Sequence, residues 1–249
     1  LDFKMFRISS LLFFLGFLES QNYPDFEVLH FDNPHSSSLF LHTMSEQNRF
    51  MAIIDSGLDV QWHVRSNHMG LDFKVNQNYL TYYNKIEGSW ILANQMMNEV
   101  DTLMCEGSYV ADYHDIQILE NGNYLLQAYD SSFVDMSTII DGGQSVAWIT
   151  GILVIQMFDI NDELISEWNA WDHLDISQYT NLNLESNAIA WMHGNSIEWE
   201  GNNQILVSNR ASNEILKVDL QSGEVLWHIG GPLNPVSYTH LTLPTKNEV

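Results

Sequence analysis

A β-hairpin can be read from the segment Asp159-Ile-Asn-Asp-Glu-Leu-Ile-Ser-Glu-Trp168. An apolar strand ends at Asp159, a turn with Asn161 follows, and a second strand closes on Trp168. Such turns favour residues that tolerate positive φ, and the closing Trp is suited to pack between layers. The same design recurs in Asp55-Ser-Gly-Leu-Asp-Val-Gln-Trp62 and Asp219-Leu-Gln-Ser-Gly-Glu-Val-Leu-Trp227. The sequence therefore predicts three hairpins of one kind.

A second kind of hairpin is predicted around Asn121-Gly122, the strongest short hairpin signal. Its strands would run from His114 to Ala128. Residues 196–208 look like a counterpart, and residues 73–82 like a weaker third copy. Two hairpins per unit make a four-stranded antiparallel sheet, and repetition of such units is typical of a β-propeller.

The predicted fold class is therefore all-β, in the form of a partial β-propeller, with a plain β-sandwich as the alternative. No helical periodicity extends over a window of helix length. We interpret residues 130–143 and 171–187 as long connections between blades.

The composition limits the classes of function. The 249 residues are 45% apolar and 12% aromatic, enough for the core of one propeller-sized domain. A net charge of −23 repels phosphate backbones, which argues against a nucleic-acid partner. The same field means that an anionic substrate must be held by a local group of donors. Cys105 is the single cysteine, so no intrachain disulfide or Cys-based metal cluster is possible. We interpret it as a buried small apolar residue.

Both ends of the chain are interpreted as lying outside the fold. Within residues 1–21, Arg7 and an apolar run to Leu18 form the pattern of a secretory signal peptide; a buried strand is the alternative. The run is short for a bilayer, so we expect no stable membrane span and a secreted or periplasmic protein. Within residues 236–249, Val236-Ser-Tyr-Thr-His-Leu-Thr-Leu-Pro-Thr245 resembles a translated sequencing adapter. Residues 22–235 would then be an incomplete propeller domain.

A candidate site is predicted by Ala190-Trp-Met-His193-Gly-Asn195-Ser-Ile-Glu-Trp-Glu200 with Val207-Ser-Asn-Arg210. His193 precedes one predicted hairpin, and His114 opens the corresponding hairpin of the neighbouring repeat. We expect the two imidazoles to converge on the channel of the propeller. Together with the Asn195 amide and the Arg210 guanidinium they would suit a tetrahedral oxyanion.

Each of these residues also has a structural interpretation. His193, next to Trp191, can be a packed histidine, and Arg210 can form an ion pair with Glu198 or Glu200. His173 lies between Asp172 and Asp175 and is interpreted mainly as loop support. The spacing of that group is too loose to favour a metal, so no metal site is predicted. His228, after Trp227, is interpreted as structural.

The chain at this point resembles the arylsulfotransferase family, which works without a nucleotide cofactor. The resemblance covers roughly residues 53–231 and rests on five motifs in the order of the family. These are Tyr113-His114-Asp115 with Asn121-Gly122-Asn123, Trp171-Asp-His173-Leu-Asp175, His193-Gly-Asn195-Ser-Ile-Glu198, Ser208-Asn-Arg210, and Ser222-Gly-Glu-Val-Leu-Trp-His-Ile-Gly-Gly231.

The resemblance implies a six-bladed propeller, of which this chain would supply about three to four blades. It implies transfer of a sulfuryl group from an aryl sulfate to a phenol, by a ping-pong reaction through a sulfohistidine. His114, His193, Asn195 and Arg210 would be catalytic, and His173 would bind substrate more weakly. In the family the nucleophilic histidine follows the Trp-x-x-Gly-Gly signature. In this chain the adapter-like segment stands where that histidine is expected. No nucleophile is therefore assigned, and we expect this fragment to be inactive alone.

Two other classes of function stay open. One is a non-catalytic propeller that binds a ligand or glycan in the channel. The other is a metal-dependent hydrolase, which the imidazoles and Arg210 in place of converging carboxylates disfavour. The absence of a Gly-rich phosphate loop argues against a nucleotide donor, so no cofactor is expected. The oligomeric state is not predicted.

Overall fold

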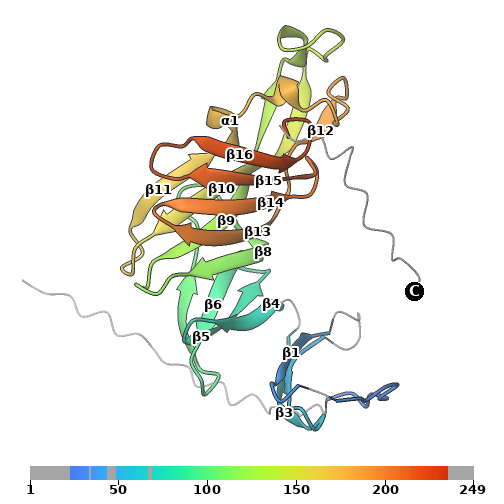
Figure 1. The fold of residues 1–249 in the computed structure, drawn as a ribbon, viewed down its shortest axis with the longest axis vertical. Helices are drawn as coiled ribbons and strands as arrows, with labels where there is room; N and C mark the ends of the chain where they lie inside the picture. The colour runs from blue at the N-terminus through green and yellow to red at the C-terminus, as the bar shows by residue number, and fades with distance from the viewer. Residues whose placement is uncertain (1–22, 34, 44–48, 67–68, 235–249) are drawn as a thin grey trace, which may run out of the picture.

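The computed structural model describes residues 23–33, 35–43, 49–66 and 69–234 (Figure 1). The predicted leader, residues 1–21, and the adapter-like segment, residues 236–249, lie outside the described residues. Within the described part of the chain, no helix is long and apolar enough to span a membrane.

Four antiparallel sheets follow one another along the chain. The first contains β1 (Leu39–His42), β2 (Phe50–Ile54) and β3 (Val60–Arg65). The second contains β4 (Met69–Asn76), β5 (Tyr79–Asn84), β6 (Ser89–Ala93) and β7 (Glu99–Leu103). The third contains β8 (Ala111–Ile118), β9 (Tyr124–Val134), β10 (Ala147–Phe158) and β11 (Leu164–Asn169), and β12 (Ala188–Ala190) pairs in parallel with β10. The fourth contains β13 (Gly194–Gly201), β14 (Gln204–Asn209), β15 (Glu214–Asp219) and β16 (Val225–Gly230).

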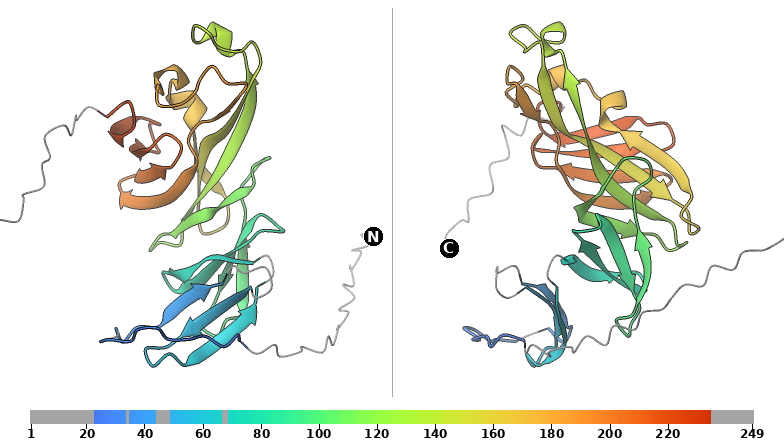
Figure 2. Two further views of the ribbon diagram at one scale, coloured as in Figure 1. Left: turned by 90° about the vertical axis from the view of Figure 1, so that its right-hand side faces the viewer. Right: turned by 180° about the vertical axis from the view of Figure 1, so that it is seen from behind.

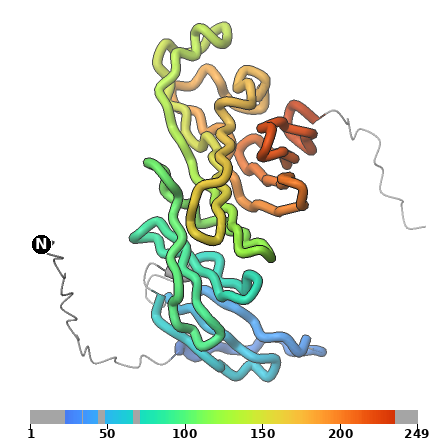
Figure 3. The backbone as a smooth tube through the Cα atoms, turned by 90° about the vertical axis from the view of Figure 1, so that its left-hand side faces the viewer, coloured from blue at the N-terminus to red at the C-terminus, as the bar shows by residue number. Residues whose placement is uncertain are grey.

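Within the last three sheets the strands lie side by side in chain order, so each sheet is an up-and-down unit of four strands. The first strands of these units, β4, β8 and β13, contact one another in series. Figures 2 and 3 show the units following one another from the blue end of the ribbon to the red end. The prediction of an all-β, partial-propeller fold is confirmed.

The repeated aspartates explain the three predicted hairpins. Asp159 accepts hydrogen bonds from the backbone N–H groups of Asn161 and Glu163, and so closes the turn between β10 and β11. Asp55 caps the β2–β3 turn and Asp219 the β15–β16 turn in the same way. A short carboxylate at the end of a strand thus accepts the hydrogen bonds of turn N–H groups that have no partner in a neighbouring strand.

The hairpin between β6 and β7 was not predicted from the sequence. Asn94 caps the turn between β6 and β7, where its side-chain oxygen accepts from the N–H groups of Met96 and Asn98. An amide oxygen performs the same task as a carboxylate, but no Trp closes the second strand.

The closing tryptophans do not all pack between layers as predicted. Trp168 is fully buried and its indole N–H donates to the Gly223 carbonyl, 3.0 Å away. Trp62 and Trp227 are half-buried. Trp62 nevertheless packs against the buried cluster of the first two sheets, with its ring centroid 6.0 Å from that of Phe73 of β4. The predicted environment therefore holds for Trp168 and, with partial exposure, for Trp62.

The largest core cluster lies between the third and fourth sheets. It includes Leu153 of β10, Trp191 before β13 and Ile197 of β13, all nearly inaccessible to solvent. Cys105 packs against a second cluster, and burial raises the pKa of its thiol to about 12. The thiol is therefore protonated at neutral pH, in line with a structural role.

The interpretation of residues 130–143 as a connection between blades was wrong. Residues 130–134 continue β9, and the remainder forms the tip of the β9–β10 hairpin, with the short helix η1 (Met136–Thr138). The tip therefore lies within one unit, at the top of Figure 1. Residues 171–187 do connect two units, and this stretch includes most of α1 (Ala170–His173) and all of η2 (Ile176–Gln178).

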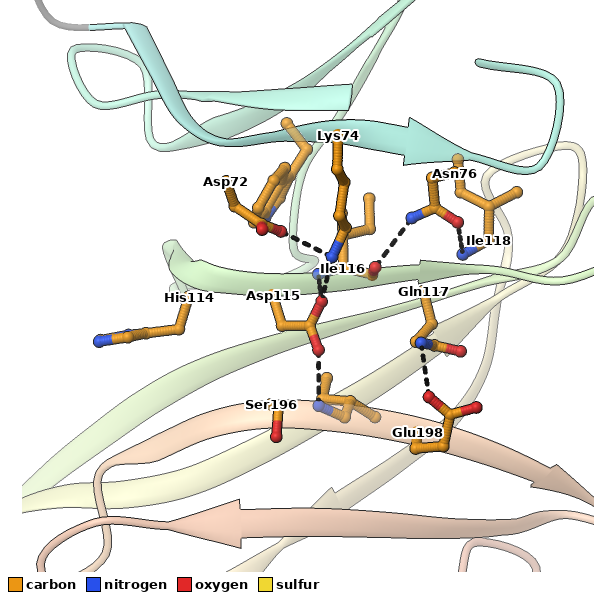
Figure 4. A network of polar contacts seen from close by, with 12 residues as sticks. Asp72, Lys74, Asn76, His114, Asp115, Ile116, Gln117, Ile118, Ser196 and Glu198 are labelled. Atoms are coloured by element: carbon orange, nitrogen blue, oxygen red, sulfur yellow. Dashed lines mark hydrogen bonds and ion pairs between the residues drawn. The ribbon is translucent and has the colours of Figure 1, made fainter. Parts of the chain in front are cut away.

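Asp115 ties the first strands of three units together (Figure 4). One carboxylate oxygen accepts from the Lys74 ammonium group of β4 and from the N–H of Ile116. The other accepts from the N–H of Ile197 in β13, 2.8 Å away. Because Asp115 is 7% exposed, these bonds compensate for the burial of its charge.

Candidate active site

His114 lies in a wide bulge of β8. Ala111 pairs with Ala128, but the next pair along the strands is Ile116 with Leu126. The intervening residues 112–115 therefore have no regular partners in β9 and leave the plane of the sheet. A bulge of this kind re-aims a side chain, and Figure 4 shows the His114 ring pointing away from the Asp115 network.

Asp112 fixes the orientation of the His114 ring. Its Oδ1 atom lies 2.6 Å from Nδ1 of His114 and also accepts the backbone N–H of that residue at 3.0 Å. Gln127 of β9, fully buried, donates to the same oxygen at 2.9 Å. An imidazole that donates its Nδ1–H to a carboxylate keeps its Nε2 atom free for a ligand.

His193 lies at the point where the chain enters β13, with a positive φ of 61°. This backbone conformation is uncommon for a residue other than glycine and is concentrated at functional sites. The turn after β14 holds it in place, since the Arg210 N–H donates to the His193 carbonyl at 2.9 Å.

The structure brings the two predicted histidines together. The rings of His114 and His193 meet edge to face, with centroids 5.0 Å apart and an interplanar angle of 71°. Tyr113 stacks on His114 at 4.3 Å, and Tyr129 of β9 stacks on His193 at 5.9 Å. The two imidazoles thus lie within a row of four rings.

The protonation of His193 is governed by its surroundings. Burial, the neighbouring His114 and the charge of Arg210 lower its pKa below the ordinary value, and Asp112 opposes them. His193 is therefore a neutral base near pH 7. The dependence on Arg210 also shows that the guanidinium lies within electrostatic reach of the imidazole, although Arg210 is exposed.

Asn195 occupies a bulge at the start of β13. Gly194 pairs with Asn209 and Ser196 with Ser208, so Asn195 is the extra residue, and it is half-buried. Gly194 itself has a steric role, because a Cβ atom there would lie 2.7 Å from Oε1 of Gln127. The motif His193-Gly-Asn195 therefore combines an imidazole, a close backbone approach and an amide.

Tyr129 and Gln127 were missed by the sequence analysis. The Tyr129 hydroxyl donates to the Gly194 carbonyl at 2.6 Å, and burial followed by the charge of Asp112 raises its pKa. It is therefore a protonated phenol that supports the backbone beneath His193. Both residues lie on a regular strand, where Gln and Tyr give no sequence signal of a site.

The ion-pair interpretation of Arg210 finds no support in the described contacts of its two proposed partners. Glu200 pairs with Lys217 at 2.6 Å, and Glu198 accepts from Nε2 of Gln117 at 3.4 Å. Neither glutamate is therefore seen to pair with the guanidinium in these contacts.

His173 lies in a different environment from the histidine pair. It stacks on Trp168 with centroids 5.6 Å apart and lines a surface pocket with Glu224 and His228. His228 in turn lies 3.1 Å from the buried carboxylate of Glu214. The structure thus places His173 and His228 together, in surroundings that fit a supporting role.

The pair of imidazoles, with a guanidinium and an amide nearby, suits an anion that changes its charge during a reaction. Nitrogen donors can hold tetrahedral oxygens, and a neutral imidazole can take a proton. Among the described residues, no three His, Cys, Asp or Glu side chains are grouped so as to hold a metal ion.

The family model of arylsulfotransferase (ASST) matches residues 26–237, which is most of the sequence. The chain belongs to the arylsulfotransferase family. None of the curated protein sequences matches this arylsulfotransferase chain.

Solved structures offer remote similarities to this arylsulfotransferase chain. A Bacteroides caccae protein of unknown function shares 14% identity over 79% of this chain and 58% of its own, with a TM-score of 0.43. Glutaminyl cyclase from Myxococcus xanthus shares 14% identity over 74% of this chain and 62% of its own, with a TM-score of 0.39. The chain thus spans less than two thirds of the length of these solved proteins.

Proposed function

We propose that this protein transfers a sulfuryl group from an aryl sulfate ester to a phenol. The observation that carries the proposal is the edge-to-face pair of His114 and His193, which lies within reach of the Arg210 charge in a chain of the arylsulfotransferase family. Local cationic and N–H donors are needed here because the net charge of −23 opposes an anionic donor.

The proposed reaction has two half-reactions. A histidine nitrogen attacks the sulfur of the ester, so that an N–S bond forms and the bond between sulfur and the aryl oxygen breaks. The departing aryl oxygen keeps the electron pair and takes up a proton. A second phenol then loses its proton and attacks the sulfur through its oxygen, and the N–S bond breaks to restore the histidine.

The four predicted residues support this transfer. Arg210 and Asn195 would hold the sulfuryl oxygens while charge moves from the ester oxygen. His193, with its lowered pKa, would take the proton of the accepting phenol. His114, with Nδ1 engaged by Asp112, would in its doubly protonated form donate its Nε2–H to the sulfuryl group or to the departing aryl oxygen, and so supply the proton that this oxygen takes up. We propose that the nucleophile is a histidine other than these two.

The test is transfer from 4-nitrophenyl sulfate to phenol by the full-length protein, with no nucleotide added, followed through release of nitrophenol. His193→Asn is the informative variant, because Asn tolerates the positive φ of this position while lacking the imidazole. We expect it to fold and to lose roughly 100-fold or more of the transfer rate. The exposed, remote His35→Asn, at a site outside the strands, is the matched control and should keep full activity.

The alternative is a propeller that binds a ligand or glycan without reacting. It would bind an aryl sulfate but release no phenol from it, with or without an acceptor. Absence of turnover in the unmodified protein, together with unchanged binding in His193→Asn, would overturn the transferase proposal.

A further inference from the structure

The β9–β10 hairpin extends past the sheet at the same end as His114. The first residue of β8, Ala111, pairs with Ala128 of β9. β9 then continues to Val134, which pairs with Ala147 of β10. The outer part of the hairpin therefore projects beyond β8, and Figure 1 shows it at the top of the molecule.

One face of this projection continues the face of the candidate site. Gln127 and Tyr129 both donate to the Gly194 carbonyl, so they point towards the entry of β13. Side chains alternate along a strand, and the irregularity in the pairing lies on β10, between Ile149 and Ile152. Phe133 therefore shares the face of Tyr129.

Phe133 and Trp148 form an aromatic pair on this face. They are direct cross-strand partners, with ring centroids 4.4 Å apart. Phe133 is 69% exposed and Trp148 is half-buried. Tyr129 on this face and Val134 on the opposite face both pack against the largest core cluster, whereas neither Phe133 nor Trp148 does. Cross-strand packing explains why the two rings touch, but any apolar pair would satisfy the hairpin without presenting so much aromatic surface to solvent.

Phe133 and Trp148, here called the platform, lie at a defined distance from the histidines. Tyr129, whose ring stacks on His193, is four residues from Phe133 along β9. Four residues of strand span about 13 Å. A single-ring phenol is too short to contact both the histidine pair and the platform, whereas a phenol of three linked rings can.

We propose that Phe133 and Trp148 are an aryl-binding subsite that holds the distal ring of an extended phenolic substrate. The reacting oxygen of that substrate lies at His114 and His193, so the inference rests on the proposed function. Offset stacking on exposed aromatic surface binds a neutral ring without opposing the acidic field of the protein. The platform thus selects substrates by their number of rings.

The experiment measures transfer from 4-nitrophenyl sulfate to two acceptors, phenol and the rigid three-ring 4-hydroxyterphenyl, by the full-length protein. The variants are Phe133→Ser and Trp148→Ser. The matched control is Phe31→Ser, an exposed aromatic residue that precedes the first sheet in the chain. We expect each platform variant to raise KM for the three-ring acceptor by roughly 3- to 10-fold. The KM for phenol, the kcat for both acceptors and all constants of Phe31→Ser should stay unchanged.

Equal losses with both acceptors would mean that the pair only stabilises the hairpin, and unchanged constants would mean that no ring binds there; either result overturns the inference. If the unmodified protein transfers to no acceptor, the proposed function fails first. Calorimetric binding of 4-hydroxyterphenyl then decides. Binding that both platform variants weaken supports the subsite, and binding that they leave unchanged, or no binding, overturns it.

Discussion

The carboxylate of Asp112 orients the His114 ring, a role that the sequence does not reveal. A single oxygen of Asp112 accepts hydrogen bonds from the ring Nδ1 of His114, from the backbone N–H of the same residue and from the side-chain amide of Gln127. Asp112 is therefore a positioning residue, since it acts on the reaction through the ring that it orients.

Asp112→Asn tests this role. The Asn oxygen can still cap the backbone N–H, but the bond to the ring changes from charge-assisted to neutral. We expect the fold to persist and kcat to fall roughly 10-fold or more with little change in KM, because the ring is less well oriented in the transition state. The Nδ1 proton of His114 in the NMR spectrum should also move upfield. The exposed Asp101→Asn, which likewise loses a carboxylate that caps a backbone N–H, is the control.

The lowered pKa of His193 predicts a dependence on pH. Folding lowers the pKa below 6.5, so between the two values the unfolded chain binds more protons than the folded one. The neutral ring of His193 therefore adds to the free energy of unfolding. This addition is complete above pH 6.5 and is lost as the pH falls through the window between the two pKa values. Arg210→Gln removes a neighbouring cation and should move the His193 pKa upward, and the acidic limb of activity with it.

The measurement is an NMR titration of the His193 ring in the unmodified protein and in Arg210→Gln. Arg65→Gln, in the first sheet, is the matched loss of charge and should leave the titration unchanged. An unchanged His193 pKa in Arg210→Gln would mean that the guanidinium does not interact with the imidazole, and it would contradict the assigned site.

Individual residues of the site were predictable only where they carried unusual chemistry. His114 and His193 stood at equivalent places of two repeats, and the structure brings their rings into contact. The motif Tyr113-His114-Asp115 does not contain the carboxylate that orients the ring, however. Asp112 holds the ring, while Asp115 joins strands, and only the bulge in β8 separates these roles.

At the scale of the strands, Asp115 of β8 bonds to both β4 and β13. We expect Asp115→Ala to lower the free energy of unfolding by about 1–3 kcal/mol, because it leaves the Ile197 N–H unsatisfied and removes one of the two carboxylates that pair with Lys74, the other being Asp72. Asp115→Asn, which keeps an acceptor for Ile197, should lose about half as much. Urea denaturation measures both, and a loss under about 1 kcal/mol for the Ala variant would contradict the assignment.

Hairpins were the elements that the sequence predicted best. Asp55, Asp159 and Asp219 mark turns through short-range backbone capping, which is a local property of the chain. Residues 130–134 were misread because Ser and Asp resemble loop composition, although pairing with β10 makes them a strand. That pairing depends on residues distant in sequence, so no local pattern could show it.

The charge of the whole molecule also has a measurable effect. With 9 Lys and Arg against 32 Asp and Glu, the folded chain repels itself. Salt screens this repulsion, so we expect Tm to rise by several degrees between about 0.02 M and about 0.5 M salt. NaCl and KCl should act equally if screening is responsible. A Tm that stays constant or falls would show that attractive surface pairs outweigh the repulsion.

The contacts between sheets run along the chain in one direction. The sheet of β4 contacts the first sheet, β8 contacts β4, and β13 contacts β8. Each sheet therefore finds its docking surface in a part of the chain that has already left the ribosome when its own strands emerge. Sheet-by-sheet docking during synthesis, from the N-terminus onward, follows from this order, and the third sheet completes its largest core only when the fourth sheet has emerged.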